Sequence, residues 1–412
     1  MWSVPKSPVR LTPVWLWAVE TLTKISYPAW MGGRLRRRVC NPLARLAAAR
    51  THHSDHRHLL ATAAPAAARA AQLDAVIVPT ARPVSWTREA IALAKNLRCT
   101  LVALCSRRNS ARDVTHLAEE QSVPALALDM RDCHLHVAGT SSAELVDGGN
   151  FYHDSDVGEK RNLGLLLSRI AGWKRVLFLD DDIYDVNPGH AGAAAGLLDR
   201  YAAVSLQNVG FPDNSVVCHA FRMVGGPQEQ FIGAGAMAVA PTRTRSFFPV
   251  NYNDDWLYLL GDAQPPRVAM TGSMRQKKFD PFATAERARS EEFGDSLAEG
   301  LFWLLDDHLP LQRADDEYWQ SFLHRRARFI ERLLARVRRV IEDSDLRTRM
   351  VASLTEARET HKAIGPELCS EYVRRWRSDL EAWQRRIDDT PVGLGIDQAL
   401  VHLGLSDVVH RS

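Results

Sequence analysis

The chain has 412 residues, of which 46% are hydrophobic and 25% are charged, and these are ordinary proportions for a globular protein. Its length predicts more than one average domain, and it contains no uncharged apolar run of roughly 18 residues, so we expect no membrane span. Its six cysteines form no CxxC pair, and prolines and charges interrupt the first thirty residues. We therefore expect no zinc site, disulfide framework or signal peptide, and the predicted location is the cytoplasm.

The formal net charge of +3 is unevenly distributed along the chain. Residues 1–73 contain eleven Lys and Arg against two acidic residues, which gives this segment a charge of +9. The arginine-rich run 34–38 is accompanied by five aromatic residues, namely Trp2, Trp15, Trp17, Tyr27 and Trp30. This combination predicts a basic aromatic arm over 1–73 with peripheral contact to an anionic membrane surface. Packing of the arm on the main domain is the alternative.

From residue 74 the sequence alternates between apolar runs and helical patterns. Continuous apolar runs predict strands over 74–80, 100–106 and 125–129, and helical spacing predicts helices over 85–96 and 111–120. This alternation predicts a doubly wound α/β sheet, in which ligands bind beyond the carboxyl ends of the strands. Pro79, Thr80, Arg82 and Ser106 fall at such ends and are predicted to bind a ligand there.

Three consecutive aspartates, Asp180, Asp181 and Asp182, follow the predicted strand 175–179. Adjacent carboxylates at a strand end repel one another and lose hydration, and a bound cation offsets that cost. Hard oxygen ligands favour Mg²⁺ or Mn²⁺ over zinc. In an extended segment side chains alternate, so Asp180 and Asp182 are expected to point to the same side and ligate one ion. An exposed acidic turn is the alternative.

The run from Phe178 to Asp182 resembles the DxD motif of GT-A-fold glycosyltransferases, and two other segments are similar to that family. Val78-Pro79-Thr80 resembles the first-strand motif that meets the base and ribose, and Lys160-Arg161-Asn162, which opens a predicted helix over 160–171, resembles a segment of family 2 enzymes. The resemblance implies a GT-A type, mostly parallel sheet and a nucleotide diphosphate sugar donor. The predicted donor-binding residues are Pro79, Thr80, Arg82, Ser106, Lys160, Arg161, Asn162 and Asp181. By themselves, Lys160 and Arg161 would indicate only a helix-surface pair.

Two later segments extend the predicted site. Gly233 and Gly235 lie in a small-residue turn that opens a strand, where glycine permits close approach to a ligand or tight packing. In inverting family 2 enzymes a segment placed like 253–256 carries the general base. The resemblance therefore implies that Asp255, with Asp254 in place of the usual Glu, is catalytic and that Trp256 stacks on a sugar ring. A helix that begins with two acids is the alternative.

The remaining chain predicts a helical C-terminal region over 306–412, because apolar residues recur there at spacings of three and four. Its arginine-rich face is typical of a solvated surface, so no nucleic-acid partner is expected. Residues 74–305 are then the GT-A-like catalytic domain. Within it, the polar segments 275–278 and 291–295 indicate either a lid over the phosphates or an ordinary surface loop.

Together these features predict a metal-dependent glycosyltransferase that moves a hexosyl or related sugar from a nucleotide diphosphate sugar to the hydroxyl of an unknown acceptor. The alternative is a nucleotide-sugar mutase related to reversibly glycosylated polypeptides, which have a similar acid triplet and a downstream acidic pair beside Trp. The two reactions differ in their need for an acceptor. A nucleotidyltransferase would need a glycine-rich loop after the first strand, and residues 79–83 contain no glycine.

Overall fold

The computed structural model describes residues 56–63, 68–133, 140–147, 149, 151, 153–261 and 267–412. Thr51–Ser412 form one compact unit. The aromatic and arginine-rich part of the expected arm, residues 1–55, lies outside the described residues. Among the helices of the described residues, none combines the length and the apolar character that a membrane crossing requires.

The centre of the fold is a sheet whose inner strands are buried on both faces. β2 (Ala75–Thr80), β3 (Thr100–Cys105), β4 (Ala125–Asp129) and β5 (Val176–Leu179) are almost entirely buried. They pair in parallel, with Ala75 opposite both Thr100 and Val176. This burial explains why the sequence shows continuous apolar runs there, and the predicted strands at these positions are confirmed.

The complete sheet is mixed and mostly parallel, in the order β1-β9-β7-β8-β5-β2-β3-β4-β10. β8 (Ala236–Val239) runs antiparallel to both of its neighbours, β5 and β7 (Ala203–Asn208). β9 (Val268–Gln276) pairs in parallel with β7 and with β1 (Ala61–Ala63), and it also pairs with the short β6 (Ile183–Tyr184). At the opposite edge, β10 (Val409–Arg411) lies antiparallel to β4.

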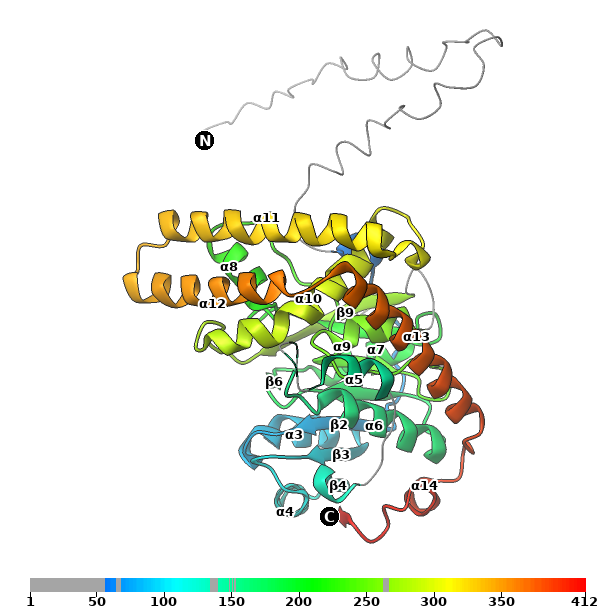
Figure 1. Ribbon diagram of the computed structural model, residues 1–412. Helices are drawn as coiled ribbons and strands as arrows, with labels where there is room; N and C mark the ends of the chain where they lie inside the picture. The colour runs from blue at the N-terminus through cyan, green and yellow to red at the C-terminus, as the bar shows by residue number, and fades with distance from the viewer. Residues whose placement is uncertain are drawn as a thin grey trace, which may run out of the picture. The chain divides into compact units, whose positions relative to one another are not determined.

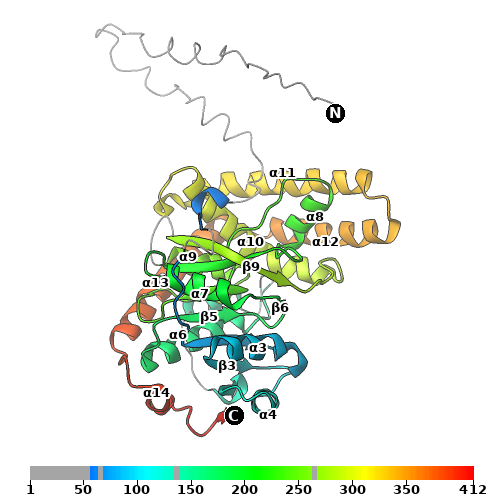
Figure 2. The same ribbon diagram turned by 180° about the vertical axis from the view of Figure 1, so that it is seen from behind.

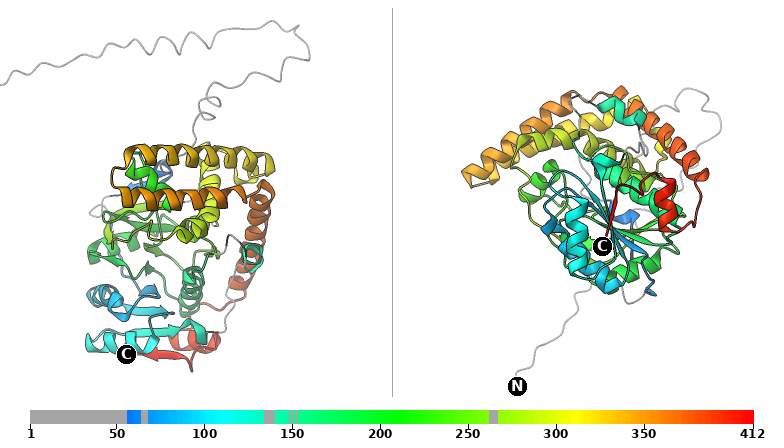
Figure 3. Two further views of the ribbon diagram at one scale, coloured as in Figure 1. Left: turned by 60° about the vertical axis from the view of Figure 1, so that its left-hand side comes forward. Right: turned by 90° about the horizontal axis from the view of Figure 1, so that it is seen from below.

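Helices cover both faces of the sheet (Figures 1 and 2). One apolar core joins alternate strand residues such as Val76 and Leu177 to α3 (Arg88–Leu97), α4 (Ala111–Glu120) and α7 (Pro188–Leu197). The other joins Ile77 and Phe178 to α6 (Val157–Ala171), α9 (Asp254–Leu260), α10 (Ala285–Asp306), α13 (Pro366–Asp388) and α14 (Ile396–His402). Seen from below, the strands fan out between these helices (Figure 3).

A third apolar cluster lies away from the sheet, where α11 (Asp316–Val340) and α12 (Ser344–Lys362) pack with α8 (Val216–Met223). These helices confirm the predicted helical character of the C-terminal region. That region also contributes β10 to the sheet edge, so the chain returns to the central sheet at its end. The remaining short elements are α5 (Thr140–Val146), which contacts α13, and the 3-10 helices η1 (Arg57–Leu59), η3 (Val84–Thr87), η4 (Met130–Asp132) and η5 (Leu311–Arg313).

Two expectations from the sequence are wrong in detail. β1 lies inside the segment assigned to the arm, because residues 61–63 complete the sheet edge beside β9. The polar segment 291–295 is not a lid or a surface loop, since it lies within α10, where Glu291, Glu292 and Asp295 are buried. These carboxylates pair internally with cationic side chains such as Arg326, so acidic composition did not indicate exposure.

Candidate active site

The three aspartates form a turn at the carboxyl end of β5. The strand ends at Leu179, and the amide of Ile183 donates to the carbonyl of Asp180 at 3.1 Å. The amide of Asp180 is bound by the carbonyl of Gly235, and the carbonyl of Asp182 accepts from Lys277. The premise of an extended segment with alternating side chains is therefore wrong, because β5 ends before the triplet. All three residues nevertheless border one cavity of about 400 Å³.

Asp181 is bound by the loop that follows β2. Its carboxylate accepts hydrogen bonds from the Thr80 hydroxyl at 2.9 Å, from the amides of Ala81 and Arg82 at 3.2 and 3.3 Å, and from the Arg82 guanidinium. The residue is buried. Asp181 therefore fixes the first-strand loop against the triplet, and the structure does not leave its carboxylate open for a donor ribose.

Arg82 and Asp182 meet at the mouth of the same cavity. The guanidinium of Arg82 lies 3.2 Å from Oδ2 of Asp182, and Gln276 donates to that oxygen at 3.4 Å. Burial, together with the charges of Asp180 and Asp181, raises the pKa of Asp182 to about 6, and Arg82 only partly offsets this rise. The side chain of Arg82 is 47% exposed, so it can move when a ligand arrives.

Arg161 connects the acid triplet to the acidic pair at the start of α9. Its Nη2 donates to Asp180 at 2.9 and 3.1 Å, and its Nη1 donates to both oxygens of Asp254 at 3.1 Å. Burial alone would lower the pKa of Arg161, but the charges of Asp180 and Asp254 outweigh that effect and raise it. The side chain is 5% exposed, so Arg161 holds two loops together at a fixed distance.

The two neighbours of Arg161 on α6 have structural partners. Lys160 is fully buried, and its ammonium donates to the Thr80 carbonyl at 2.9 Å and to the Ser106 hydroxyl at 2.7 Å, while pairing with Asp156 at 2.9 Å. Its pKa is lowered by burial. Asn162 exchanges two hydrogen bonds with the backbone of Phe248. Lys160 still borders the cavity, whereas both polar groups of Asn162 are used within the core, which contradicts the expected contact with the donor.

The acidic pair occupies the first turn of α9. Oδ2 of Asp255 accepts from the amide of Ala234 at 2.9 Å, and its Oδ1 accepts from the amide of Trp256 at 2.9 Å. Burial raises the pKa of Asp255 and raises that of Asp254 to about 7. A Cβ at position 233 would lie 3.3 Å from Oδ2 of Asp255, so Gly233 allows the close approach of this turn to the carboxylate. The expected helix start with two acids is observed, and it faces a cavity.

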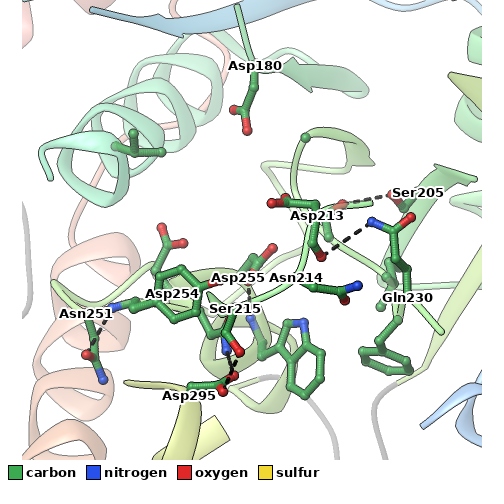
Figure 4. Close-up of a pocket in the computed structure, with 18 of the residues that line it drawn as sticks. Asp180, Ser205, Asp213, Asn214, Ser215, Gln230, Asn251, Asp254, Asp255 and Asp295 are labelled. Atoms are coloured by element: carbon green, nitrogen blue, oxygen red, sulfur yellow. Dashed lines mark hydrogen bonds between the residues drawn. The ribbon is translucent and has the colours of Figure 1, made fainter. Parts of the chain in front are cut away.

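A second cavity of about 210 Å³ lies between the triplet and the acidic pair. Figure 4 shows the carboxylates of Asp180, Asp213, Asp254 and Asp255 pointing into the same space. Gly233, Gly235 and Trp256 also border this cavity. The indole of Trp256 packs against Phe231, Phe302 and His56, so it forms part of an aromatic wall. Asp180 borders both cavities and therefore lies at their junction.

Sequence reasoning missed Asp213 and Asn214, which lie between β7 and α8. The run Phe211 to Ser215 is typical of a turn before a capped helix, and Ser215 does cap α8 by accepting from the amide of Cys218. No catalytic motif marks these positions. The segment after β7 continues to bind β9 through the amides of Val209 and Phe211, and Asp213 and Asn214 then border the same cavity as Asp255.

Within the described residues, one group of three side chains offers metal-ligand atoms within 4.8 Å of one another, and it is Cys218, Asp295 and Glu299. Asp295 is bound by Arg326 and Glu299 lies beside His56, so cationic side chains already offset these charges. The acid triplet does not form such a compact group. Asp180 and Asp182 could therefore supply only part of the coordination of an ion, with the remaining ligands coming from a substrate or from water.

No protein-family model matches the chain, and no curated protein matches it. Among solved structures, the chain is similar to mannosyltransferase PcManGT from Pyrobaculum calidifontis in complex with GDP-Man and Mn²⁺, with 11% identity and a TM-score of 0.37. The match covers 82% of this chain and 87% of that chain. An identity of 11% and a TM-score of 0.37 are too low to transfer a fold family or an activity.

Proposed function

We propose that the chain is a metal-dependent glycosyltransferase of the GT-A type, which moves a sugar from a nucleotide diphosphate sugar to an acceptor hydroxyl. The observation that carries this proposal is the position of Asp180 at the junction of two cavities. One cavity is bordered by the first-strand loop and the acid triplet, as a nucleotide diphosphate site would require. The other is bordered by the acidic pair and Trp256, as an acceptor site would require.

The chemistry of the triplet fits a hard divalent cation, Mg²⁺ or Mn²⁺. The pKa of Asp182 is raised first by burial and then by the charges of Asp180 and Asp181, and a bound cation would offset both effects. Asp182 and Asp180 would hold the ion, with Arg82 released toward the donor phosphates. When bound, such an ion stabilises the charge that grows on the leaving nucleotide diphosphate.

The donor site is proposed to comprise Pro79, Thr80 and Arg82, which border the first cavity. Lys160 and Asp181 support the donor site indirectly, because each binds Thr80 and thereby fixes the loop that follows β2. Ser106 serves the same purpose as the hydroxyl partner of Lys160. This arrangement keeps the donor loop in place before the nucleotide binds, which reduces the entropy cost of binding.

We assign removal of the acceptor proton to Asp255. Its carboxylate borders the second cavity, and burial raises its pKa toward the range of a working general base. Asp254 is bound at both oxygens by Arg161, so its role is to position that arginine. Arg161 in turn fixes the distance between the base and Asp180.

The proposal is tested by thermal unfolding with a panel of nucleoside diphosphates (UDP, GDP, ADP, CDP and dTDP), each with and without Mn²⁺. We expect one base to stabilise the protein only when Mn²⁺ is present, by about 2.7 kcal/mol at a hundredfold excess over the dissociation constant. The matching nucleotide sugars are then assayed for release of nucleoside diphosphate. If no nucleotide binds with metal, the proposal is wrong. Conversion of a nucleotide sugar into an isomer without acceptor would indicate the mutase reaction.

A further inference from the structure

In the segment before α8, the side chains of Asp213 and Asn214 border the second cavity, while the backbone and neighbouring side chains of the segment are hydrogen-bonded within the protein. Asn208 binds the carbonyl of Phe211 at 2.7 Å and the amide of Gly210 at 2.9 Å. The carbonyl of Asp213 accepts from Gln230 at 3.4 Å, and the Ser215 hydroxyl donates to Asp295 at 2.7 Å. These contacts fix the backbone without using the side chain of Asp213.

Asp213 and Asn214 are available to a ligand. The carboxylate of Asp213 is exposed to the cavity and has no hydrogen-bond or ion-pair partner among the described residues. Asn214 is only 8% exposed, yet its Nδ2 lacks an acceptor within the same part of the chain. Figure 4 shows both side chains directed into the cavity. A buried donor without an acceptor is costly, so a ligand oxygen at this place would recover the lost hydrogen bond.

This cavity holds more carboxyl groups than cationic side chains, and burial, together with the charges of Asp182, Asp255 and Asp180, raises the pKa of Asp213 to about 7. Arg161 is the one cationic side chain at neutral pH among the described lining residues, because burial lowers the pKa of His153 to about 4. Arg161 is shared between Asp180 and Asp254. Neither Asp213 nor Asp255 forms a direct ion pair within the described structure, although the charges of Arg287 and Arg161 act on their carboxyl groups without contact. An ion of charge 2+ beside Asp180 would be offset by the diphosphate of the donor, so the excess negative charge would remain.

We propose that Asp213 and Asn214 form the acceptor subsite and that the acceptor is a polyhydroxylated amine. Its ammonium group pairs with Asp213, and one of its hydroxyls accepts from Nδ2 of Asn214. This inference rests on the proposed function, because it names the acceptor class of the same site. A neutral polyol would leave the charge of Asp213 unpaired, and an anionic acceptor would be repelled by it. The aromatic wall that includes Trp256 offers an apolar face to the ring of such an acceptor.

The test compares three probes with the same ring, namely D-glucosamine, D-glucose and D-glucuronate. Each is titrated by calorimetry into the full chain loaded with Mn²⁺ and the nucleoside diphosphate that binds. We expect glucosamine to bind about tenfold more tightly than glucose, and glucuronate to bind more weakly than glucose. Asp213→Asn should reduce the preference for glucosamine to about twofold or less, because a neutral amide cannot pair with the ammonium group.

Two further variants separate this subsite from general effects. Asn214→Ala should weaken glucosamine and glucose by the same factor, since both present hydroxyls. Asp199→Asn removes an exposed carboxylate that pairs with Arg175 outside the cavity, and it should leave all three affinities unchanged. Equal binding of glucosamine and glucose, binding of none of the probes, or a preference that survives in Asp213→Asn would overturn the inference. If no nucleotide binds, the proposed function fails, and the same titrations on the nucleotide-free protein still decide the preference for the amine.

Discussion

Nη2 of Arg161 lies 2.9 Å from Oδ1 of Asp180, and the arginine side chain is buried, with 5% of its surface exposed. The same guanidinium binds Asp254, so a single residue on α6 connects the end of β5 with the start of α9. The start of α9, which is distant in sequence, is thereby held beside the consecutive elements α6 and β5.

The first prediction concerns this bridge. Arg161→Met should lower the free energy of unfolding by about 3–5 kcal/mol, because it leaves two carboxylates without their shared cation. Urea unfolding measures the change. The matched control is Arg175→Met, which removes an exposed pair with Asp199 and should cost about 1 kcal/mol or less. Equal losses in the two variants would show that the bridge adds nothing to stability.

The second prediction concerns the metal. Asp182→Asn should abolish Mn²⁺-dependent binding of nucleoside diphosphate while preserving the fold, because it removes charge from a crowded acidic site. Calorimetry with and without Mn²⁺ gives the affinity, and circular dichroism checks the fold. Asp185→Asn is the control, since Asp185 is an exposed carboxylate that pairs with Arg275 beyond β6. Unchanged Mn²⁺-dependent affinity in Asp182→Asn would refute the metal assignment.

The third prediction concerns the general base. Asp255→Asn should reduce turnover on the order of 10²–10⁴-fold, because this is the usual contribution of general base catalysis to the rate. The affinity for the donor should change little. Asp254→Asn should have a smaller effect on turnover. Initial rates at saturating donor measure both variants. The reverse order would move the base to Asp254, and near-normal turnover in both would remove this pair from the mechanism.

The fourth prediction concerns pH and uses a carboxyl group outside the acid triplet. Burial raises the pKa of Glu291 from 4.5 to about 7 in the folded chain, despite its contacts with Arg287 and the amide of Val216. A raised folded-state pKa of an acid contributes stability that is complete below the unfolded pKa and is lost as pH rises through the folded pKa. In the native chain, this group should therefore lower the free energy of unfolding by about 3 kcal/mol at most as the pH rises from 4.5 to 7. Glu291→Gln should remove this part of the pH dependence.

Urea unfolding at pH 5 and pH 8 compares the variant with the native chain. Glu286→Gln, in the exposed first turn of α10, is the matched control and should leave the pH dependence unchanged. If Glu291→Gln retains the full pH dependence, the titration belongs to other groups.

The fifth prediction concerns the basic segment outside the described residues. Residues 1–50 contain nine Lys and Arg and one acidic residue, together with five aromatic side chains. We expect the full chain to co-sediment with anionic liposomes and to dissociate as salt rises, because screening acts over about 8 Å at physiological ionic strength. A chain that begins at Thr51 keeps the compact unit and serves as the comparison. Equal co-sedimentation of both chains would exclude a role for this segment.

The sequence by itself determined the central parallel strands and the helices between them. Val76 and Ile77 are both apolar because β2 is buried on both faces. A continuous apolar run of this kind can be recognised within one strand, without knowledge of its neighbours. The sequence also singled out the acid triplet, because neighbouring carboxylates are costly unless a ligand or a cation offsets them, whereas the acidic pair was singled out by the family resemblance. The edge strand β1 was missed, since three residues of Ala and Thr give no distinct periodicity.

Only the tertiary structure decided how these groups are paired. By themselves Lys160 and Arg161 indicate a helix-surface pair, but the packing of α6 against β2 buries Lys160 against the Thr80 carbonyl and directs the next residue but one, Asn162, toward Phe248. Asp213 acquires its importance from the neighbouring β7 and β9, which place it opposite Asp255 across a cavity. Such juxtapositions join residues far apart in the chain, and local periodicity carries no record of which distant group will satisfy a given charge.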